Sequence, residues 1–300
     1  MIATTRNIAE ANVITHSGLF HADEVFGTVI LSKILDNVTV LRTSKVPDDI
    51  GDNTIVYDVG FGKFDHHQKG GNGVRKNGVP YASAGLLWRE FGPKIVSNTP
   101  DPKLVWNLID IELIQGIDAV DNGALTVVDS NPTVMSLPRI ISSFNPRWNT
   151  NEDADTAFLE AVKLAETVFD NALAIAISKA EAQTLVEKAI EHSNGHIMVL
   201  DRYMPWQGAL FNSKNPKAEE IFFVIFPSNR EGFNWQCVPE VSGGFVHRKP
   251  VPTEWRGLND KELQAVTGIN TAIFCHKSGF IGGAETLEDA IALAKIAIAS

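Results

Sequence analysis

Cysteine is scarce in this sequence. The chain has two cysteines among 300 residues, Cys237 and Cys275, and they form neither a Cys-x-x-Cys nor a mixed Cys/His pattern. This content argues against a disulfide framework, and the wide spacing argues against a zinc knuckle. We therefore expect both residues to be buried thiols that serve in packing.

Long apolar runs are also missing. No apolar stretch reaches the roughly 18 residues that a membrane span requires, so we predict no membrane partner. Residues 1–12 contain one arginine and no apolar core of a secretory signal, which predicts a cytoplasmic protein. A chain of this length that is 44% hydrophobic can bury a large core, and the length favours two domains.

The sequence also lacks an excess of positive charge. The chain has 26 basic and 36 acidic side chains, a net charge of -10, and the acidic excess is largest in residues 151–194. This balance argues against binding of duplex nucleic acid through a broad basic face. It does not exclude a phosphate substrate, because several acids in residues 1–150 are candidate metal ligands whose charge bound cations would offset.

Short apolar runs alternate with amphipathic stretches in the first part of the chain. The order predicts a strand, a helix and two more strands over residues 12–15, 22–35, 38–41 and 54–57. Such alternation is typical of an α/β fold in which helices flank a mainly parallel sheet. After the Gly-rich loop 70–80, a helix is expected from Ser83 to a stop at Gly92 and Pro93.

After residue 150, the sequence predicts a helical stretch and then a mixture of strands and helix. Residues 153–192 lack proline and glycine and predict one or two long helices. Later strands and a final helix are expected over 196–200, 220–226, 235–238, 272–275 and 287–299. We predict three parts, namely a catalytic domain, a helical connector and a smaller α/β substrate-binding domain, over residues 1–150, 151–194 and 195–300.

Histidine and acidic side chains follow the predicted strands. Ligands of parallel sheets collect beyond the carboxyl ends of the strands, so these side chains should meet at one edge. Imidazole and carboxylate groups suit transition or hard divalent ions, and two such ions suit hydrolysis of a phosphate ester. The sequence therefore predicts a dinuclear metal centre. The candidate residues are His16, His21, Asp23, Asp58, Asp65, His66, His67 and Asp121.

Each candidate also has an ordinary structural explanation. Residues 65–67 could form a solvated turn, His16, His21 and Asp23 could cap a helix, and Asp58 could close a strand into a turn. We favour metal binding because all these groups occur together at one predicted edge.

Asp118 and Asp121 are alternatives for one ligand position. They lie three residues apart and would share one face of a helix that persists that far. Asn122 and Gly123 signal a turn directly after them, so one of the two can be a cap instead of a ligand. We favour Asp121.

The donor set is suited to direct attack of water on phosphorus. Two ions would neutralise the ester oxygens and acidify a water, so no covalent intermediate is required. We expect Asp65, His66 and His67 to be the catalytic residues. Either histidine could protonate the leaving oxygen or hold the phosphate instead of binding metal, and the spacing leaves that choice open.

Contacts to substrate are expected in the last third of the chain. A Gly-rich turn within residues 274–283 could hold a phosphate through N–H groups and nearby positive charge, and aromatic rings could stack on bases. Taken singly, a surface ion pair or a packed aromatic side chain explains each residue as well. The predicted contacts are Arg202, Trp206, Arg248, His276, Lys277, Gly282 and Gly283.

Many motifs occur in one order over essentially the whole chain. They are His16 to Glu24, residues 65–67, Ala84 to Leu86, Asp118 to Gly123, Phe144 to Trp148, Asp201 to Trp206, Arg248 to Pro250, Trp255 to Leu258 and Gly279 to Gly283. Together they resemble the melanocyte-proliferating-gene family, which is similar to a branch of the DHH phosphoesterase superfamily. The resemblance implies an N-terminal α/β domain with a bimetallic site and a C-terminal domain that binds substrate.

The resemblance also implies roles for individual residues. Asp65 and His67 would support the centre or contact phosphate, and His21 stands where many DHH proteins place a carboxylate. We expect two divalent cations, with manganese favoured and magnesium as the alternative. The implied metal-site residues are His16, His21, Asp23, Asp58, His66 and Asp121.

The expected activity follows from the eukaryotic members, which resemble RNA exonucleases that act from the 3′ end. We predict a metal-dependent 3′–5′ exonuclease whose partner is single-stranded RNA or a short oligonucleotide. Two alternatives remain open: a phosphatase or pyrophosphatase for a small metabolite, and a metal-stabilised binding protein without turnover. The sequence is compatible with a homo-oligomer and does not determine one.

Overall fold

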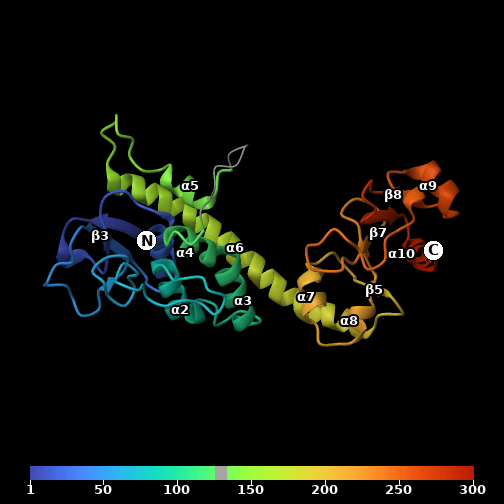
Figure 1. Cartoon of the computed structure of the whole chain (residues 1–300), viewed down its shortest axis with the longest axis horizontal. Coiled ribbons are helices and arrows are strands. Elements are labelled where there is room, and N and C mark those ends of the chain that lie inside the picture. Colours follow the sequence, from blue (N-terminus) through green and yellow to red (C-terminus); the bar gives the residue numbers. More distant parts are fainter. Residues whose placement is uncertain (126–133) are drawn as a thin grey trace. The chain divides into compact units, whose positions relative to one another are not determined.

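The computed structural model describes residues 1–125 and 134–300, and these divide into two compact units. The first unit comprises Met1–Ile177 and the second Ser178–Ser300. Each unit contains its own sheet with helices against it (Figure 1). The predicted α/β class is confirmed.

The sheet of the first unit has four parallel strands in the order β1-β3-β2-β4. The three strands predicted from the apolar runs are confirmed as β2 (Val13–His16), β3 (Val38–Thr43) and β4 (Ile55–Val56). The strand β1 (Ile2–Thr5) was not predicted. It is a short, half-buried edge strand that contains two threonines, so it lacks the apolar run by which the others were recognised.

Helix α1 (Ala22–Ser32) is the central helix of the first unit and is buried over residues 22–31. It packs closely against α2 (Ser83–Ile95). Gly27 permits this approach, since a Cβ atom there would lie 2.8 Å from the Tyr57 ring and 3.0 Å from Leu87.

The predicted stop of α2 at Gly92 and Pro93 is wrong, because the helix continues to Ile95. Gly92 is a packing residue: a Cβ atom there would lie 2.8 Å from the rings of both Trp88 and Trp106. Pro93 lacks the N–H that would donate to the Arg89 carbonyl, yet the helix continues past it for two residues.

Apart from α6 (Ala154–Glu191), the remaining helices of the first unit are short. The 3₁₀ helix η1 (Ile8–Glu10) lies before β2, and α5 (Leu137–Ser142) follows the undescribed segment. Three consecutive helical segments, α3 (Pro102–Ile109), the π-helical η2 (Asp110–Ile114) and α4 (Gln115–Asp121), form one continuous helical path. Asp101 caps the start of α3, where its side chain accepts a hydrogen bond from the Leu104 amide.

Helix α6 (Ala154–Glu191) is a single 38-residue helix, in agreement with the predicted long helical segment. Its first part buries Phe158 and Phe169 in the first unit, and its last part contributes Val186 and Ile190 to a core cluster of the second. The boundary between the two units therefore falls inside α6. The three-part division of the chain into folding domains stays a prediction.

The second unit contains a five-stranded sheet in the order β5-β6-β7-β9-β8. The β5–β6 pair is parallel and the other pairs are antiparallel. Its strands are β5 (Ile197–Val199), β6 (Phe223–Pro227), β7 (Phe233–Cys237), β8 (Ala272–Cys275) and β9 (Ile281–Ala284).

Two apolar clusters cover the two faces of this sheet, as alternation along β6 requires. Phe223 and Ile225 belong to one cluster, and Val224 and Phe226 belong to the other. The helices are α7 (Trp206–Asn212), α8 (Lys217–Glu220), η3 (Thr253–Trp255), α9 (Asp260–Thr267) and α10 (Leu287–Ala299). Within the described ranges, no helix has both the length and the apolar character to cross a bilayer.

Candidate metal centre

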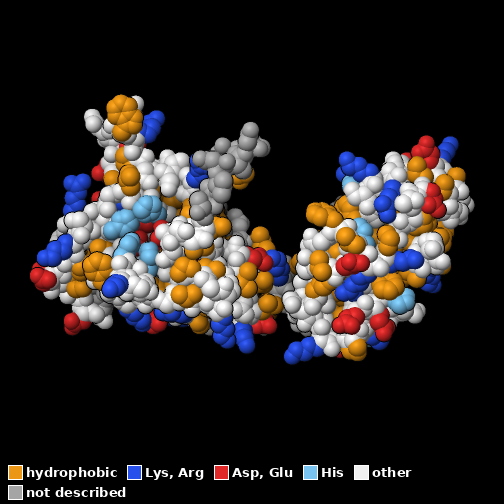
Figure 2. All heavy atoms as spheres, viewed as in Figure 1, with side chains coloured by type: hydrophobic (Ala, Val, Ile, Leu, Met, Phe, Trp, Pro, Cys, Tyr) orange, Lys and Arg blue, Asp and Glu red, His pale blue; other side chains and the backbone are white. Residues whose placement is uncertain are grey.

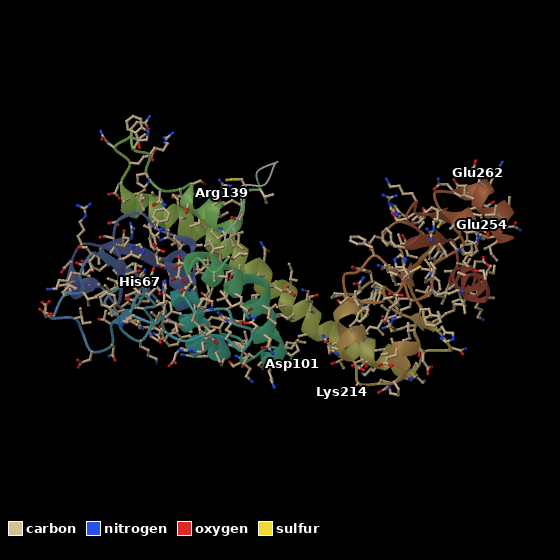
Figure 3. The ribbon with its side chains drawn as sticks, viewed as in Figure 1. His67, Asp101, Arg139, Lys214, Glu254 and Glu262 are labelled. Carbon is tan, nitrogen blue, oxygen red and sulfur yellow. The ribbon has the colours of Figure 1, made fainter. Side chains whose placement is uncertain are left out.

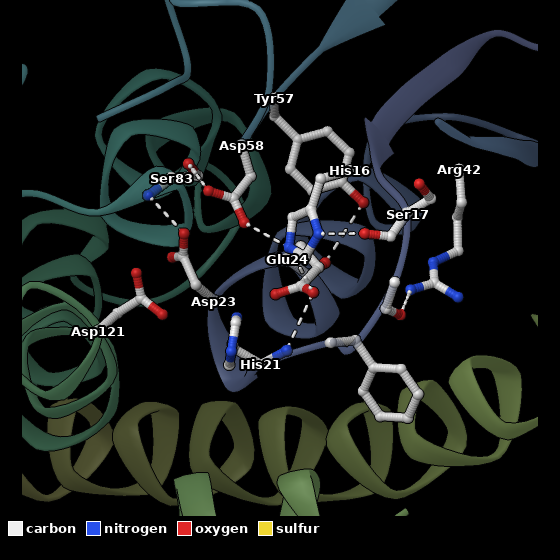
Figure 4. A network of polar contacts seen from close by, with 12 residues as sticks. His16, Ser17, His21, Asp23, Glu24, Arg42, Tyr57, Asp58, Ser83 and Asp121 are labelled. Atoms are coloured by element: carbon white, nitrogen blue, oxygen red, sulfur yellow. Dashed lines mark hydrogen bonds and ion pairs between the residues drawn. The ribbon is translucent and has the colours of Figure 1, made fainter. Parts of the chain in front are cut away.

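The carboxyl ends of two neighbouring strands meet the start of α1 in the first unit. His16 is the last residue of β2, Asp58 follows β4 closely, and β2 pairs directly with β4. Asp23 and Glu24 lie in the first turn of α1. Figure 4 shows these side chains directed toward one another. The predicted convergence at one sheet edge is therefore present in the geometry.

His16 lies between two carboxylates. Its Nε2 is 2.8 Å from Glu24 Oε1 and 3.3 Å from Asp58 Oδ2, and its Nδ1 is 3.0 Å from the carbonyl oxygen of Ser17. If Nδ1 donates to that carbonyl, Nε2 of a neutral ring carries only a lone pair. That lone pair would face the oxygens of both carboxylates, which is unfavourable. Burial lowers the pKa of His16, but its hydrogen bonds to Asp58 and Glu24 raise it to about 11. This position therefore favours a positive charge.

Glu24 was not selected from the sequence. Its side chain is fully buried; Oε1 accepts a hydrogen bond from the His21 amide, while Oε2 has no hydrogen-bond partner among the described residues. An acidic residue in the first turn of a helix is ordinary, since it complements the helix dipole. The sequence signal was therefore only its spacing of three from His21. A buried carboxylate oxygen without a donor fits a site for a cation.

Asp23 and His66 form the next part of the cluster. The carboxylate of Asp23 accepts hydrogen bonds from the amides of Ser83 and Ala84 at the start of α2, at 2.9 and 2.6 Å. His66 Nδ1 lies 3.7 Å from Asp23, and His66 Nε2 lies 3.0 Å from Asp121 Oδ2. Burial and the charges of Asp58 and Asp121 raise the pKa of Asp23 well above its usual range. A cation among these carboxylates would relieve that repulsion.

Asp58 lies between the two groups. Its Oδ2 faces His16, while its Oδ1 lies 3.5 Å from His66 Nδ1 and accepts a hydrogen bond from the Ser83 hydroxyl at 3.1 Å. Ser83 was expected only as a helix start, and it also supports this carboxylate. Asp58 adopts a φ of 56°, a left-handed conformation that is uncommon for residues other than glycine. Its position suits a bridging carboxylate.

Asp65 and His67 lie at the edge of the cluster, where Asp65 is buried and His67 is exposed. Asp65 Oδ1 lies 2.8 Å from His67 Nδ1 and accepts from the His67 amide, while Oδ2 accepts from the Phe61 amide at 2.6 Å. Burial alone would raise the pKa of Asp65, but these hydrogen bonds lower it. Asp65 is thus occupied by its own loop, and His67 faces outward (labelled in Figure 3).

Asp118 and Asp121, the two alternatives for one ligand position, have different contacts. Asp121 faces His66, whereas Asp118 is buried and accepts hydrogen bonds from Arg75 at 2.7 Å and from the Gly85 amide at 3.0 Å. Burial raises the pKa of Asp118 to about 7. Arg75, to which no sequence motif points, also pairs with Asp110 at 2.7 Å.

A cavity of about 950 Å³ opens beside these groups. In the space-filling view of the first unit, histidine side chains gather in a hollow with acidic atoms between them (Figure 2). Apolar side chains complete the wall. The lining includes His16, Leu19, His21, Lys45, Val46, Asp58, Phe61, Asp65, His67, Ile117, Val120, Asp121 and Pro138. This volume lies at the upper end of the roughly 300–1,000 Å³ of small-molecule pockets.

The histidines and acids fit divalent cations by their chemistry. Three groups of possible ligand atoms, each within 4.8 Å of one another, are Asp58 with Asp65, His66 and His67; His16 with His21 and Glu24; and Asp23 with His66 and Asp121. Nitrogen and oxygen donors in these combinations suit divalent cations. Buried histidine and acidic clusters that can hold metal are therefore present.

The residues predicted to contact substrate in the second unit have different surroundings. Arg202 is exposed beside Asp201, with 3.9 Å between their nearest charged atoms. Trp206 is only 2% exposed and belongs to the core around α6 and α7, so its ring has no face for a base. Arg248 Nη1 donates to the carbonyl oxygens of Ala218, Glu219 and Ile221. Its guanidinium therefore serves the end of α8.

The predicted Gly-rich turn is shorter than expected. His276 and Lys277 lie in a turn, but Gly282 and Gly283 lie in β9, between β7 and β8. A Cβ atom at Gly282 would lie 2.2 Å from the Trp235 ring, which explains the glycine by close packing. The prediction of a turn at these two glycines is wrong because strand pairing takes up their backbone. Cys237 and Cys275 are free, buried thiols, as expected.

Comparisons with known proteins give consistent matches. A family model described as Uncharacterised protein family (UPF0160), MYG1_exonuc, matches residues 12–298. The MYG1 protein of Schizosaccharomyces pombe is 32% identical, with 95% of this chain and 97% of that protein covered. Proteins called MYG1 exonuclease are 31% identical in Mus musculus and 30% identical in Homo sapiens; the matches cover 97% of this chain and 86% and 87% of those proteins. No solved structure matches the chain.

Proposed function

The chain belongs to the MYG1 exonuclease family, and from this membership we propose that it is a divalent-metal-dependent exonuclease that removes nucleotides from the 3′ end of single-stranded RNA or short oligonucleotides. The relatives named as exonucleases support a nuclease-type function. The observation that carries the proposal is the buried cluster of histidines and carboxylates beside an open cavity. The family's relation to the DHH superfamily stays a prediction.

The donor groups suggest how two cations would be held. His16, His21 and Glu24 would bind one cation, and Asp23, His66 and Asp121 would bind the other. Asp58 would contact both, since its two oxygens face His16 and His66. The four carboxylates of this set carry a charge that two divalent cations would balance.

The cations would supply Lewis acidity, which neutralises phosphoryl oxygens and makes an attacking water more acidic. The chain itself would supply orientation and a proton. His67 Nδ1 is held by Asp65 at 2.8 Å, so a hydrogen on Nδ1 leaves Nε2 for the cavity that His67 lines. We assign His67, in the imidazolium form with one hydrogen on Nδ1 toward Asp65 and a second on Nε2, as the group that gives its Nε2 proton to the leaving oxygen, and Asp65 as its positioning residue. His66 has both ring nitrogens among carboxylates and is assigned to the metals.

Contacts of the second unit with substrate are a further part of the proposal. His276 and the exposed Lys277 lie together in the turn before β9 and remain candidates for phosphate binding. Arg202 remains a candidate because its side chain is exposed. The core position of Trp206, the carbonyl contacts of Arg248 and the strand positions of Gly282 and Gly283 remove them from our proposal.

An end-labelling experiment tests the polarity and the substrate. Manganese-loaded protein is incubated with single-stranded RNA that carries a label at the 5′ end, with and without a block at the 3′ end. We expect a ladder of labelled fragments that shorten by one nucleotide, no ladder from the blocked RNA, and no cleavage in excess chelator. Release of short labelled products from the 5′ end would contradict the polarity.

Matched variants and small substrates complete the test. Asp121→Asn should abolish the ladder, whereas Asp52→Asn, an exposed residue that does not line the cavity, should retain it. If phosphate is released only from pyrophosphate or mononucleotides, a small-molecule phosphatase replaces the proposal. If manganese raises the melting temperature but no substrate turns over, a metal-stabilised binding protein replaces it.

A further inference from the structure

Phe61 is an exposed aromatic residue on the rim of the metal-site cavity. It is 68% exposed, although a phenylalanine loses much favourable free energy when its ring stays in water. It lines the same cavity as Asp58 and His67. The ring is therefore available to a molecule that reaches the metal centre.

The backbone at Phe61 is held in an unfavourable conformation. Its φ is 57°, in the left-handed region that residues other than glycine rarely adopt, and Asp58 and Gly60 also have positive φ values of 56° and 85°. Such strain persists only where the surroundings impose it, and it often marks a functional site.

Three contacts hold this conformation. The Phe61 amide donates to Asp65 Oδ2 at 2.6 Å, and the Asp65 amide donates to the Gly62 carbonyl at 3.2 Å. On the other side, Gly60 lies against Val46, where a Cβ atom would approach the Val46 side chain to 2.7 Å. The loop that carries Phe61 is thus tied to the first residue of the Asp-His-His run. The backbone point from which the ring projects is therefore fixed relative to the metal ligands.

The surroundings of the ring suit one terminal nucleotide. Val46 and the exposed Leu19 supply further apolar surface on the cavity wall. Lys45 is exposed and is the sole lysine or arginine in the described lining. A bare phosphate or pyrophosphate would leave the aromatic ring without a partner, whereas a nucleotide would place its phosphate at the metals and its base on the ring.

We propose that Phe61 forms a nucleobase subsite beside the metal centre and that this subsite makes the site selective for a terminal nucleotide over a bare phosphate. The inference rests on the proposed function for the placement of the phosphate at the metals. Lys45 serves the same subsite as a contact for a phosphate or sugar oxygen. Stacking of an aromatic ring on a base tolerates all bases, which suits an exonuclease that degrades any sequence.

The test measures binding, so that its outcome does not depend on turnover. Calorimetric titration gives the Kd of AMP and of ribose 5-phosphate, which lacks the base, for manganese-loaded protein. We expect the wild type to bind AMP about ten- to a hundred-fold more tightly, the range of one stacked base. In Phe61→Ala this preference should fall to a few-fold, while the Kd of ribose 5-phosphate changes little.

Phe61→Tyr is the matched control because it keeps the ring. It should retain the preference for AMP, and Phe61→Leu should lose most of it. Phe61→Gly separates binding from folding, since glycine tolerates the positive φ: its melting temperature should equal or exceed that of the wild type while its AMP preference is lost.

The outcomes distinguish this inference from the proposed function. An equal preference for AMP in wild type and Phe61→Ala, or no preference in the wild type, would overturn the base subsite even if RNA is degraded. Loss of the preference in Phe61→Ala would support the subsite even if the end-labelled RNA stays intact, in which case the exonuclease proposal alone fails.

Discussion

The first unit buries two groups of carboxylates and neutralises them in different ways. Asp110 and Asp118 face the guanidinium of Arg75, each with an ion pair at 2.7 Å. The second group faces histidine rings instead, at distances from 2.8 to 3.7 Å. It consists of Asp23, Glu24, Asp58 and Asp121.

The difference separates a structural charge from an exchangeable one. A guanidinium is always protonated and is fixed to the chain, so Arg75 connects η2 and α4 with a charge that a bound ion does not replace. An imidazole can lose its proton and bind a cation in its place. The first group therefore supports the fold, and the second is arranged to accept ions. Each group takes one residue from α4, Asp118 in the first group and Asp121 in the second.

Removal of the fixed charge should have the largest effect. Arg75→Met leaves Asp110 and Asp118 buried without their partner, and we expect a loss of about 3–5 kcal/mol in the free energy of unfolding. Urea denaturation with chelator present measures it. Arg89→Met is the matched control, since Arg89 is exposed and stacks on the same Tyr81 ring. Its effect should stay within about 0.5 kcal/mol. Equal losses in both variants would remove the distinction.

Asp58→Asn tests the other group and should act on activity instead of stability. Changes to groups that only orient metal ligands cost roughly 10- to 100-fold, so loss of the central carboxylate should cost more than about 100-fold in kcat/KM. In chelator the variant should lose little stability, because the change relieves the repulsion between Asp58 and Asp23 while it weakens the pair with His16. A marked destabilisation in chelator would show that Asp58 has a structural role like that of Asp118.

Addition of manganese should stabilise the wild type through the histidine group. At a concentration of about 100 times Kd, the gain in unfolding free energy should be about 2.7 kcal/mol. It should rise between about pH 5 and pH 8, because the cation must displace protons from its ligands. Thermal melts of wild type and Asp58→Asn check both points. The same gain in the variant, or a gain that does not depend on pH, would contradict the assigned ligands.

Loss of the partly exposed ion pairs of Lys33 should have a smaller effect. Lys33 pairs with Glu166 and Asp170 on α6, at 3.1 and 2.7 Å. Burial lowers the pKa of Lys33, but the hydrogen bonds to Asp170 and Glu166 raise it above its ordinary value. Lys33→Met should therefore cost no more than about 1 kcal/mol, with both partners partly exposed.

The sign of the pH effect at Lys33 follows from the raised pKa. The stabilisation is complete below the pKa of lysine in the unfolded chain, and it is lost as the pH rises through the higher pKa of the folded protein. Denaturation of wild type and Lys33→Met at neutral and at strongly alkaline pH should therefore give curves that converge at the alkaline end. Lys163→Met, at a more exposed pair, should have a smaller effect at either pH. A stability difference between wild type and Lys33→Met that grows with pH would contradict the expected sign of the pH effect.

Much of the fold was predictable because it is encoded locally. The absence of proline and glycine over residues 153–192 predicted α6, and the final helix has the predicted bounds, Leu287–Ala299. Local signals failed where packing decided the outcome. Gly92 serves a close approach of two tryptophan rings and not a helix end, and Gly282 lies in a strand under Trp235.

The same division applies to the candidate site. The histidines and aspartates were selected by their residue types and their positions after strands, and the structure brings His16, Asp23, Asp58, His66 and Asp121 together. Glu24 was missed because an acidic residue at a helix start is ordinary. Arg75 was missed because its partners are 35 and 43 residues away in the sequence, so the residues next to it in the chain do not indicate the ion pairs.

By itself the sequence determined the α/β alternation, the long helix, the supply of nitrogen and oxygen ligands, and the resemblance to the family. These are properties of residue types and short spacings. Tertiary structure alone decided that Asp118 meets an arginine while Asp121 meets a histidine, that Trp206 is a core residue, and that Phe61 is held outward at a positive φ. Such outcomes depend on which distant segments pack against a side chain, and that is set only when the whole chain has folded.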